Sequence, residues 1–444
     1  MTLVQITAGA GGMYCGICFR DNAVVAALRK MGHDVLMVPL YLPLTLDEED
    51  QSAGVPIFFS GINVYLEQKS ALFRHAPRWL HQLLTSRMLL GWVGSKAART
   101  QPQDLGDLTL SMLRGEEGNQ ARDLDDLIHW LKTQAKPEVI MLSNALLIGL
   151  ARRLKSELGV PVVCMFQGED GYLDALPEAY RADCWKVLAE RASESDGLAA
   201  PSRYFADLMA QRLNLPADSI QVVRNGINIS GYSAGPRASV EAQTPVIGYF
   251  ARMCRDKGLD ILVEAWLLLR KRGHVRNVRL KIGGGCGPTD EVFVAPLRRR
   301  IEEAGLSKDV EFYRNPDRSA KIEFLRSLPV FSVPARSREA FGLYVVEAMA
   351  AGTPVVQPRG GSFPEIIEAT GGGLLFEPEN PESLAGALEE LLLAPERARD
   401  MGAAGQRAVL QEFSAEAMAK STLSFCQAAV SLGSSKPQPA VLGS

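Results

Sequence analysis

The chain has 444 residues, a formal net charge of −3 and a pI of about 6.1. That length exceeds one ordinary hydrophobic core, so we expect two domains, and the weak net charge argues against broad binding to nucleic acid. Seven scattered cysteines predict a reducing compartment without a disulfide framework. No basic segment precedes the first apolar residues and no apolar run reaches about 18 residues, so we expect a cytoplasmic protein.

The N-terminal pattern is typical of a β-α-β unit. Residues 3–7 form an apolar strand, residues 8–13 a glycine-rich loop, and a helix over 20–31 leads to a strand at 35–38. Tyr14 stands where the dinucleotide-binding fingerprint requires its third glycine, so that oxidoreductase motif fails. The glycines of the loop either make a plain turn or border a ligand.

Two thiols, Cys15 and Cys18, lie three residues apart near the start of this helix. Such a pair can be redox-active or form half of a metal site. The sequence has no second pair that would complete a zinc site, so we favour packing or incidental reactivity.

The pattern loosens after the second strand. Residues 55–59 and 62–66 predict two short strands joined by a hairpin turn, and residues 124–131 predict a helix. A helical insertion is expected at about 67–120. Within it, residues 67–99 carry six basic residues against one acidic residue, interleaved with aromatic and aliphatic side chains. This composition predicts contact with an anionic membrane surface or, slightly favoured, packing on the first domain.

The rest of the first domain continues the alternation of strands and helices. We expect this domain to span residues 1–228 and a linker rich in Ser, Gly and Ala to span 229–244. Its further elements are strands at 136–142, 160–166, 196–202 and 220–228 and a helix at 145–158.

A second β-α-β domain is expected at 245–414. Its first strand ends in a loop that carries Arg252 and Lys257, two cations that can clamp a diphosphate or simply be solvated. A strand at 278–282 ends in a glycine run around Gly284, which either makes a turn or lets a ligand approach the backbone.

Residues 334–356 predict a loop, a helix and a strand at the carboxyl edge of a parallel sheet, where open α/β folds bind ligands. Glu339 and Glu347 stand about 12 Å apart if the span between them is helical. Alternatively, Glu339 is a favourable charge in a first turn and Glu347 is solvated, although its neighbours are apolar. Free backbone N–H groups for a phosphate are predicted at Phe341, Gly342 and Leu343.

Two runs in this segment, EAFGL at 339–343 and EAMAAGTPVV at 347–356, resemble the paired-glutamate motif of glycosyltransferase family 4. The resemblance implies the α/β fold called GT-B, in which two Rossmann-like domains with parallel sheets face each other across a cleft. It also implies a retaining enzyme that takes its sugar from a nucleotide diphosphate sugar.

The resemblance assigns roles to residues of both domains. Glu347 would hold the ribose hydroxyls, Glu339 the sugar hydroxyls, and Arg252 with Lys257 the diphosphate. The expected catalytic residues are Glu339, Arg252 and Lys257, and stabilisation of the leaving group by the two cations would carry most of the catalysis. Other expected contacts with the donor are Phe341, Gly342, Leu343, Gly11, Gly12 and Gly284.

On the acceptor side the chain departs from the family pattern. Gln167 stands where many family members have a histidine, and glutamine offers hydrogen bonds but cannot take a proton. Glu169 and Asp170 are candidates to bind acceptor hydroxyls; equally, they would cap the following helix.

The C-terminal segment predicts a helix over 415–432 with Ser414 as its N-cap, followed by a disordered tail at 433–444. By resemblance to GT-B proteins, this helix would cross back to the first domain.

We therefore expect a hexosyltransferase that needs neither metal nor cofactor and transfers sugar to a glycan, a lipid-linked acceptor or a small molecule, with no nucleic-acid partner. Residues 67–99 would provide any peripheral contact with the inner face of a membrane. The alternatives are another GT-B enzyme, such as an epimerase or a phosphorylase, and a non-catalytic protein that binds nucleotide sugars.

Overall fold

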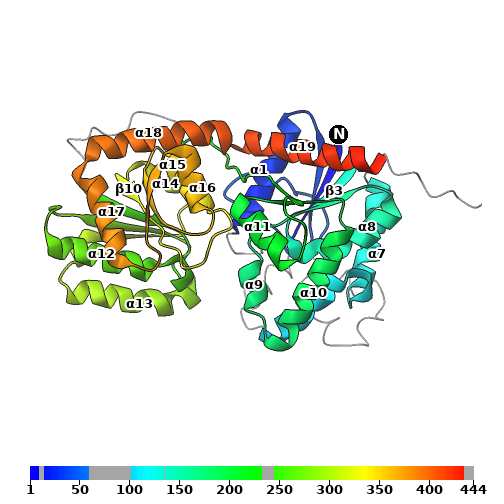
Figure 1. Cartoon of the computed structure of the whole chain (residues 1–444), viewed down its shortest axis with the longest axis horizontal. Coiled ribbons are helices and arrows are strands. Elements are labelled where there is room, and N and C mark those ends of the chain that lie inside the picture. The colour runs from blue at the N-terminus through cyan, green and yellow to red at the C-terminus, as the bar shows by residue number, and fades with distance from the viewer. Residues whose placement is uncertain (10–14, 60–101, 135, 233–244, 435–444) are drawn as a thin grey trace, which may run out of the picture. The chain divides into compact units, whose positions relative to one another are not determined.

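The computed structural model describes residues 1–9, 15–59, 102–134, 136–232 and 245–434 (Figure 1). The chain divides into two compact units, of which unit 1 contains Met1–Arg224 with Met418–Ser444 and unit 2 contains Asn225–Ala417. The chain thus leaves unit 1 just after a strand and re-enters it within the C-terminal helix. Most of the predicted linker at 229–244 lies outside the described residues, and the predicted domain bounds remain predictions.

Unit 1 is built on a parallel sheet. Within the described residues its strand order is β2-β1-β3-β4-β5-β6. Strand β3 is buried along its whole length, as expected for a strand covered by helices on both faces. The strands are β1 (Thr2–Thr7), β2 (Asp34–Pro39), β3 (Val139–Leu142), β4 (Val162–Met165), β5 (Gly197–Ala200) and β6 (Ile220–Val222).

The helices of unit 1 begin and end at recognisable signals. Ser202 caps the helix after β5 by accepting a hydrogen bond from Phe205 N at 3.1 Å. Gly159 ends the helix before β4 with a left-handed φ of 67°. The helices are α1 (Gly16–Lys30), α6 (Pro102–Arg114), η2 (Gly115–Glu117), α7 (Ala121–Gln134), η3 (Ala145–Leu150), α8 (Ala151–Leu158), α9 (Asp170–Asp174), α10 (Glu178–Glu194), α11 (Arg203–Arg212) and α19 (Ala415–Ser434).

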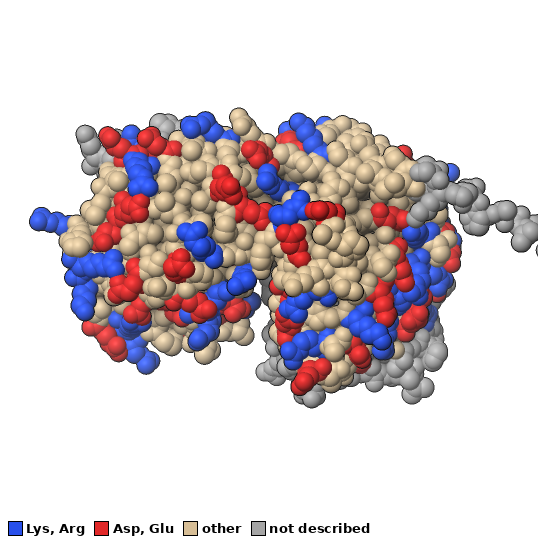
Figure 2. Space-filling view, in the orientation of Figure 1, with Lys and Arg blue, Asp and Glu red and all other residues tan. Residues whose placement is uncertain are grey.

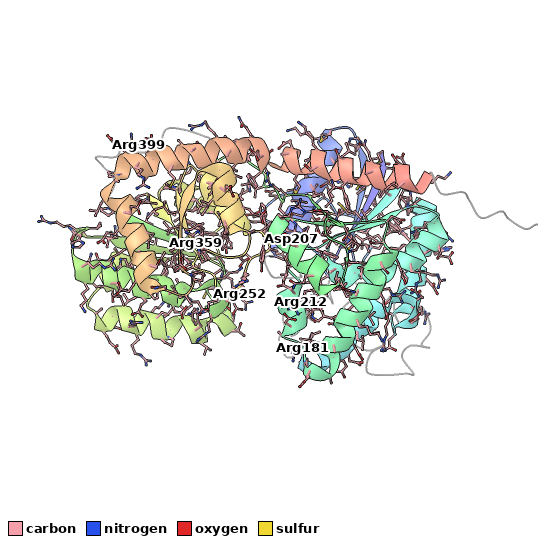
Figure 3. The ribbon with its side chains drawn as sticks, viewed as in Figure 1. Arg181, Asp207, Arg212, Arg252, Arg359 and Arg399 are labelled. Atoms are coloured by element: carbon pink, nitrogen blue, oxygen red, sulfur yellow. The ribbon has the colours of Figure 1, made fainter. Side chains whose placement is uncertain are left out.

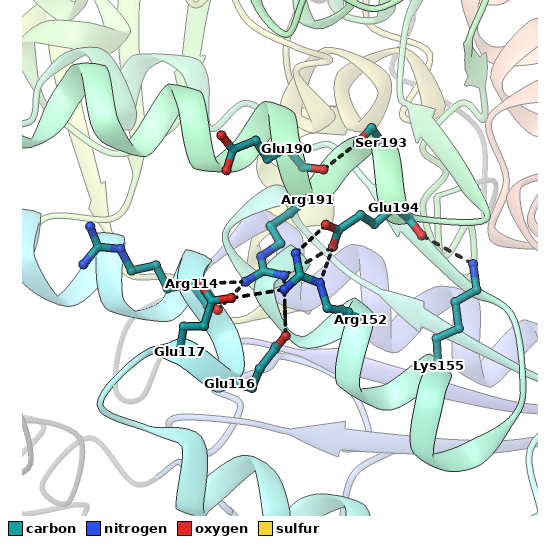
Figure 4. Close-up of polar contacts among 9 residues, drawn as sticks. All are labelled: Arg114, Glu116, Glu117, Arg152, Lys155, Glu190, Arg191, Ser193 and Glu194. Carbon is teal, nitrogen blue, oxygen red and sulfur yellow. Dashed lines mark hydrogen bonds and ion pairs between the residues drawn. The ribbon is translucent and has the colours of Figure 1, made fainter.

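A group of ion pairs fastens the helical layer of unit 1 (Figure 4). Arg191 on α10 is 3 % exposed, and its guanidinium donates to the carbonyl of Arg114 at 2.7 Å. The same guanidinium contacts Glu194 at 3.3 Å, and Arg152 on α8 contacts Glu194 and Glu116. Shared carboxylates therefore connect α8 and α10 to the turn after α6.

Unit 2 repeats the architecture with a second parallel sheet. Across the described part of this unit the strand order is β12-β11-β10-β7-β8-β9. Its core includes Trp266, whose indole N–H donates to the carbonyl of Val278 at 3.0 Å. The strands are β7 (Val246–Phe250), β8 (Arg279–Gly284), β9 (Val310–Arg314), β10 (Val330–Phe331), β11 (Val355–Pro358) and β12 (Gly373–Phe376).

Helices cover both faces of this sheet. Helices α12 and α17 pack together, whereas α18 packs on α15 and α16 on the other face (Figure 1). The helices are η5 (Arg255–Lys257), α12 (Leu259–Arg272), α13 (Pro288–Glu303), η6 (Ser307–Asp309), α14 (Arg318–Arg326), α15 (Leu343–Ala350), α16 (Phe363–Thr370), α17 (Pro381–Leu393) and α18 (Pro395–Glu412).

Several local predictions need correction. Residues 55–59 are not a strand, and the partner strand expected at 62–66 lies outside the described residues. The helix expected over 145–158 begins as the 3-10 helix η3, and the helix expected from 20 begins at Gly16. The C-terminal helix runs to Ser434, two residues into the tail that was predicted to be disordered.

Two features of the described residues concern contact with a membrane, namely the character of the helices and the distribution of surface charge. Among the described residues, no helix combines the length and the apolar character needed to cross a bilayer. Figure 2 shows basic and acidic side chains intermixed on the viewed face of each unit. The basic segment at 67–99 lies outside the described residues.

Candidate functional site

The predicted site residues of unit 2 gather where its strand order reverses. Strand β10 pairs with β7, and β8 lies on the other side of β7. Helices α12 and α15, which follow β7 and β10, lie on opposite faces of the sheet (Figure 1). The helices that follow two adjacent strands therefore lie on opposite faces, and open α/β sheets bind ligands at such a point.

The loops after β7 and β10 are fastened to each other. Gly258 has a left-handed φ of 68°, and a Cβ at this position would lie 1.9 Å from the carbonyl oxygen of Pro334. Arg336 N donates to the carbonyl of Asp256 at 2.8 Å, and the Arg336 guanidinium donates to both carboxylate oxygens of Asp260 at 2.8 Å. A bidentate pair of this kind fixes orientation as well as distance.

Across these loops Lys257 and Glu339 form an ion pair. Their side chains are 26 % and 16 % exposed, so the pair is sheltered but remains open to a ligand. The hydroxyl of Ser337 donates to Glu339 at 3.2 Å, and the Lys257 ammonium lies 5.3 Å from the centre of the Tyr344 ring. Burial, followed by the charge of Glu339, raises the pKa of Tyr344 well above its ordinary value, so this hydroxyl stays protonated.

The backbone of Glu339 is held from the opposite side by the turn before α16. Ser362 N donates to the carbonyl of Glu339 at 3.0 Å, and the Ser362 hydroxyl donates to the carbonyl of Phe341 at 2.7 Å. Gly361 has a φ of 61°, and a Cβ there would approach the Glu339 backbone to 2.7 Å. The carboxylate thus projects from a backbone that cannot easily shift.

Glu347 lies on α15 and pairs with a lysine of the preceding helix. Lys321 Nζ lies 2.9 Å from a Glu347 carboxylate oxygen, and the two side chains are 11 % and 18 % exposed. This partner explains how a carboxylate is accommodated among the apolar residues of α15.

Arg252 follows β7 and is held by an acid of α13. Its Nε donates to Asp290 at 2.9 Å, and a second guanidinium nitrogen lies 2.9 Å from the same oxygen. Asp290 is buried and also accepts from Gly287 N at 3.0 Å, whereas the Arg252 side chain is 60 % exposed and lies at the periphery of unit 2 (Figure 3). The hydrogen bond to Asp290 raises the pKa of Arg252, which keeps its charge fixed.

Gly284 ends β8 beside this arginine. Its φ is 120°, and a Cβ there would lie 2.1 Å from the carbonyl oxygen of Ala251. Position 284 therefore requires glycine, because any side chain there would collide with the backbone of Ala251, the residue before Arg252.

One predicted detail of the motif was wrong. The helix begins at Leu343, with Gly342 as a left-handed N-cap at φ 88°, so the span from Glu339 to Glu347 is only half helical and the separation expected for a fully helical span does not apply. Phe341 lies before the helix, and its side chain packs on Phe413 with ring centres 6.0 Å apart. A Cβ at Gly342 would lie 2.7 Å from the Phe363 ring, so this cap requires glycine.

In unit 1 the predicted acceptor-side residues follow β4. Glu169 is buried, and its carboxylate accepts hydrogen bonds from the N–H groups of Ala145, Gln167 and Gly168 at 2.8–2.9 Å. Burial raises its pKa against the opposing effect of these N–H groups. Asp170 opens α9, and burial also raises its pKa. Gly11 and Gly12 lie outside the described residues.

The described parts of the chain contain no group of three or more His, Cys, Asp or Glu side chains placed to hold a metal ion. The polar groups assembled in unit 2 instead provide cations, carboxylates and backbone N–H groups.

Two family models match consecutive parts of the chain. The model of group 1 glycosyl transferases matches residues 237–408, and the model of glycosyltransferase family 4 matches residues 109–230. Together they include the polar run after β4 and every site residue of unit 2. Both models describe glycosyltransferases, and the chain is similar to them over these two ranges.

Curated relatives resemble this chain over part of their length. The chain is 31 % identical over 260 residues to a D-inositol 3-phosphate glycosyltransferase of Segniliparus rotundus, an alignment that covers 56 % of each chain. It is 27 % identical over 304 residues to a GDP-mannose-dependent α-(1-6)-phosphatidylinositol monomannoside mannosyltransferase of Mycobacterium tuberculosis, covering 66 % of this chain and 73 % of the relative. The chain thus spans just over half the length of the first relative.

Solved structures confirm the predicted GT-B fold. The Anabaena protein HepE in complex with UDP superposes with a TM-score of 0.67 at 16 % identity, covering 96 % of this chain and all of that one. Sucrose-phosphate synthase of Thermosynechococcus elongatus gives a TM-score of 0.65 at 19 % identity, covering 98 % and 100 %.

Sequence reasoning missed several residues that contact the predicted set. Asp290 had a weak signal, since it is an acid in the first turn of a helix that follows a glycine run. Lys321 had none, because a lone lysine on an amphipathic helix is usually solvated. The missed residues include Asp290, Lys321, Ser337, Tyr344 and Ser362.

Proposed function

We propose that this chain is a retaining hexosyltransferase that moves a sugar from a nucleotide diphosphate sugar to an acceptor hydroxyl without a metal ion. The observation that carries the proposal is the sheltered pair of Lys257 and Glu339, set at the point where the strand order of unit 2 reverses. A cation can bind the phosphate groups of a sugar diphosphate, and a carboxylate beside it can accept hydrogen bonds from the sugar hydroxyls.

The cations suit the diphosphate. Asp290 engages Nε and one terminal nitrogen of Arg252, so N–H groups remain on the exposed side of the guanidinium. Lys257 has three N–H donors and can contact Glu339 and a phosphate oxygen together. In a site closed to water these charges offset the negative charge that develops on the leaving diphosphate, and this stabilisation contributes most to catalysis.

The carboxylates suit hydroxyl groups. Glu339 is oriented by Ser337 and Lys257 and would accept hydrogen bonds from the transferred sugar, whereas Glu347 would accept them from the ribose. The start of α15 adds the partial positive charge of a helix N-terminus, which the backbone of Gly342 and Leu343 would present to phosphate.

Close backbone would accommodate the remainder of the donor. Gly284 would lie beside the nucleotide, and Gly11 and Gly12 beside the diphosphate. The side chain of Phe341 packs in the core of unit 2 and would support the backbone that contacts the donor.

The acceptor is proposed from two kinds of support. The names of two relatives mention an inositol phosphate and a phosphatidylinositol mannoside, which share a polyol hydroxyl beside a phosphate. In unit 1, Gln167 and Asp170 would bind such hydroxyls, while Glu169 shapes the loop through its three backbone hydrogen bonds. A lipid-linked acceptor would bring the enzyme to the inner face of a membrane, with residues 67–99 as the proposed contact.

The test is donor turnover by purified protein. UDP- and GDP-sugars are incubated with inositol phosphates and with extracted lipid acceptors, and release of nucleoside diphosphate is measured with and without EDTA. We expect one donor to be consumed at the same rate with EDTA, and Glu339→Gln to reduce kcat/KM by roughly 100-fold. Glu368→Gln, an exposed carboxylate on α16, is the matched control and should retain full activity.

Each contrary outcome is specific. Full activity in folded Glu339→Gln would contradict the assigned site, and loss of activity with EDTA would contradict the metal-free mechanism. Sugar phosphate formed from inorganic phosphate would indicate a phosphorylase, and binding without turnover of any donor would indicate a non-catalytic protein.

A further inference from the structure

Two cysteines, Cys15 and Cys18, lie at the start of α1, outside the set of residues assigned to sugar transfer. Cys15 is the N-cap of this helix, with extended backbone at φ −124° and ψ 122°, and its carbonyl accepts the first helical hydrogen bond from Phe19 N at 3.1 Å. Cys18 lies in the first turn of α1, three residues after Cys15. Side chains three residues apart at the start of a helix are neighbours.

The two sulfurs differ in exposure and in acidity. Cys15 is half-buried, whereas Cys18 is 2 % exposed. The hydrogen bond from Cys18, assisted by the nearby N–H groups of Cys18 and Ile17, lowers the pKa of Cys15 to about 6, although burial and the charge of Asp21 oppose this. The Cys15 side chain does not itself accept a capping hydrogen bond from these N–H groups. The same hydrogen bond, together with burial, raises the pKa of Cys18 well above its ordinary value.

This pattern is not that of cysteines that merely fill a core. All seven cysteines of the chain are among the described residues, and Cys15 is the one with a lowered pKa. Burial raises the pKa of the four other cysteines that depart from their ordinary value, which makes them poor nucleophiles at neutral pH. They are Cys164, Cys184, Cys286 and Cys426.

We propose that Cys15 and Cys18 form a site of thiol–disulfide exchange, in which Cys15 attacks a low-molecular-mass disulfide of the glutathione type and Cys18 resolves the product. The Cys15 thiolate forms a bond to one sulfur of the disulfide, and the other sulfur leaves as a thiolate. Cys18 gives up its proton and attacks the sulfur of Cys15, forming the Cys15–Cys18 disulfide and releasing the second small thiol. The protein loses two electrons and two protons, and the small disulfide gains them as it becomes two thiols.

The pKa of Cys15 decides at which pH its reactivity differs most from that of an ordinary thiol. At pH 6 about half of a thiol with a pKa of 6 is thiolate, against about 0.3 % of an ordinary thiol with a pKa near 8.5. The lower intrinsic reactivity of the more acidic thiolate removes roughly a factor of 13 from this advantage. The net advantage is about tenfold at pH 6 and only a few-fold at pH 7, so pH 6 is the condition for the test.

The experiment uses full-length reduced protein and oxidised glutathione at pH 6. Samples are quenched with acid, alkylated and mapped by peptide mass spectrometry. We expect the Cys15–Cys18 disulfide to form at least tenfold faster than any glutathione adduct on Cys286, the half-buried reference thiol within the same molecule. In Cys18→Ser the adduct on Cys15 should accumulate without being resolved, and Cys15→Ser should lose the fast reaction.

A second measurement requires no variant and so does not depend on their folding. The rate at which iodoacetamide alkylates Cys15 in the wild-type protein should rise with a midpoint near pH 6. A midpoint near 8.5, oxidation of Cys15 no faster than of Cys286, or a stable glutathione adduct on Cys15 in the wild type would each overturn the proposal. The exchange chemistry is independent of sugar transfer by unit 2, so either proposal can fail without the other.

Discussion

Arg252 is placed by Asp290 rather than by its own loop, and this contact can be tested directly. In Asp290→Asn the charge that restrains the guanidinium is lost, while an oxygen remains for Gly287 N. Arg252 is more than half exposed, so we expect a moderate effect: KM for the donor rises about tenfold and kcat changes less. Steady-state kinetics measure this, with Glu291→Gln on the same helix as control. Equal loss of kcat in both variants would contradict a positioning role.

Glu347 depends in the same way on Lys321. Removing the ammonium in Lys321→Met leaves a carboxylate that is mostly buried without its counter-charge. We expect the free energy of unfolding to fall by about 1–3 kcal/mol and the affinity for nucleoside diphosphate to fall with it. Urea denaturation and calorimetric titration measure the two effects. Unchanged nucleotide affinity in the folded variant would remove Glu347 from the donor site.

At the scale of elements, helix α12 provides a matched pair of glycines. Gly258 at its start and Gly273 at its end both have left-handed φ values, of 68° and 73°, but a Cβ on Gly273 would meet nothing within 4 Å. Gly273→Ala should therefore cost about 1–2 kcal/mol of stability, whereas Gly258→Ala must also displace the carbonyl of Pro334 and should cost at least about 2 kcal/mol more. Equal losses in urea denaturation would contradict the close contact between the two loops.

The clasp between Arg336 and Asp260 predicts a dependence on pH. Burial alone raises the pKa of Asp260, but the hydrogen bonds and charge of Arg336 outweigh it and hold the pKa below its ordinary value. A depressed carboxyl pKa stabilises the folded state above the unfolded pKa of about 3.9, and this stability is lost as pH falls through the lower folded pKa. Asp260→Asn should be less stable than wild type by about 1 kcal/mol at pH 7, and this difference should shrink as pH falls below the unfolded pKa of about 3.9. A gap in Tm that stays constant with pH would refute this.

The sequence predicted the strands of both sheets well because buried parallel strands are short apolar runs between clear turn signals. Residues 55–59 pair with no strand among the described residues, and β-propensity alone does not make a strand. Helix α15 begins at Leu343, two residues after Phe341, because Gly342 caps it in a left-handed conformation. These errors concern where an element begins, whereas its type was mostly right.

For the whole molecule, the sequence predicted the fold and proposed a site, but only in part. The resemblance to the family assigned Lys257 to the diphosphate and Glu339 to the sugar hydroxyls, and in the structure these two side chains form an ion pair. Asp290 and Lys321 were missed because they reach the site from helices distant in sequence, and no local pattern announces such a contact. The roles of Glu169 and Asp170 could not be decided from the sequence, because an acidic residue after a strand fits both helix capping and acceptor binding.

The most direct test of the central claim is calorimetric titration of nucleoside diphosphates and their sugars into wild-type protein, Lys257→Met and Lys271→Met. Lys271 is an exposed lysine on α12 and serves as the control. We predict that one nucleotide binds wild type and Lys271→Met equally, and that Lys257→Met weakens its binding at least tenfold through loss of a charge-assisted hydrogen bond to phosphate. Equal binding by folded Lys257→Met, or no binding of any nucleotide to wild type, would contradict the assignment of this site.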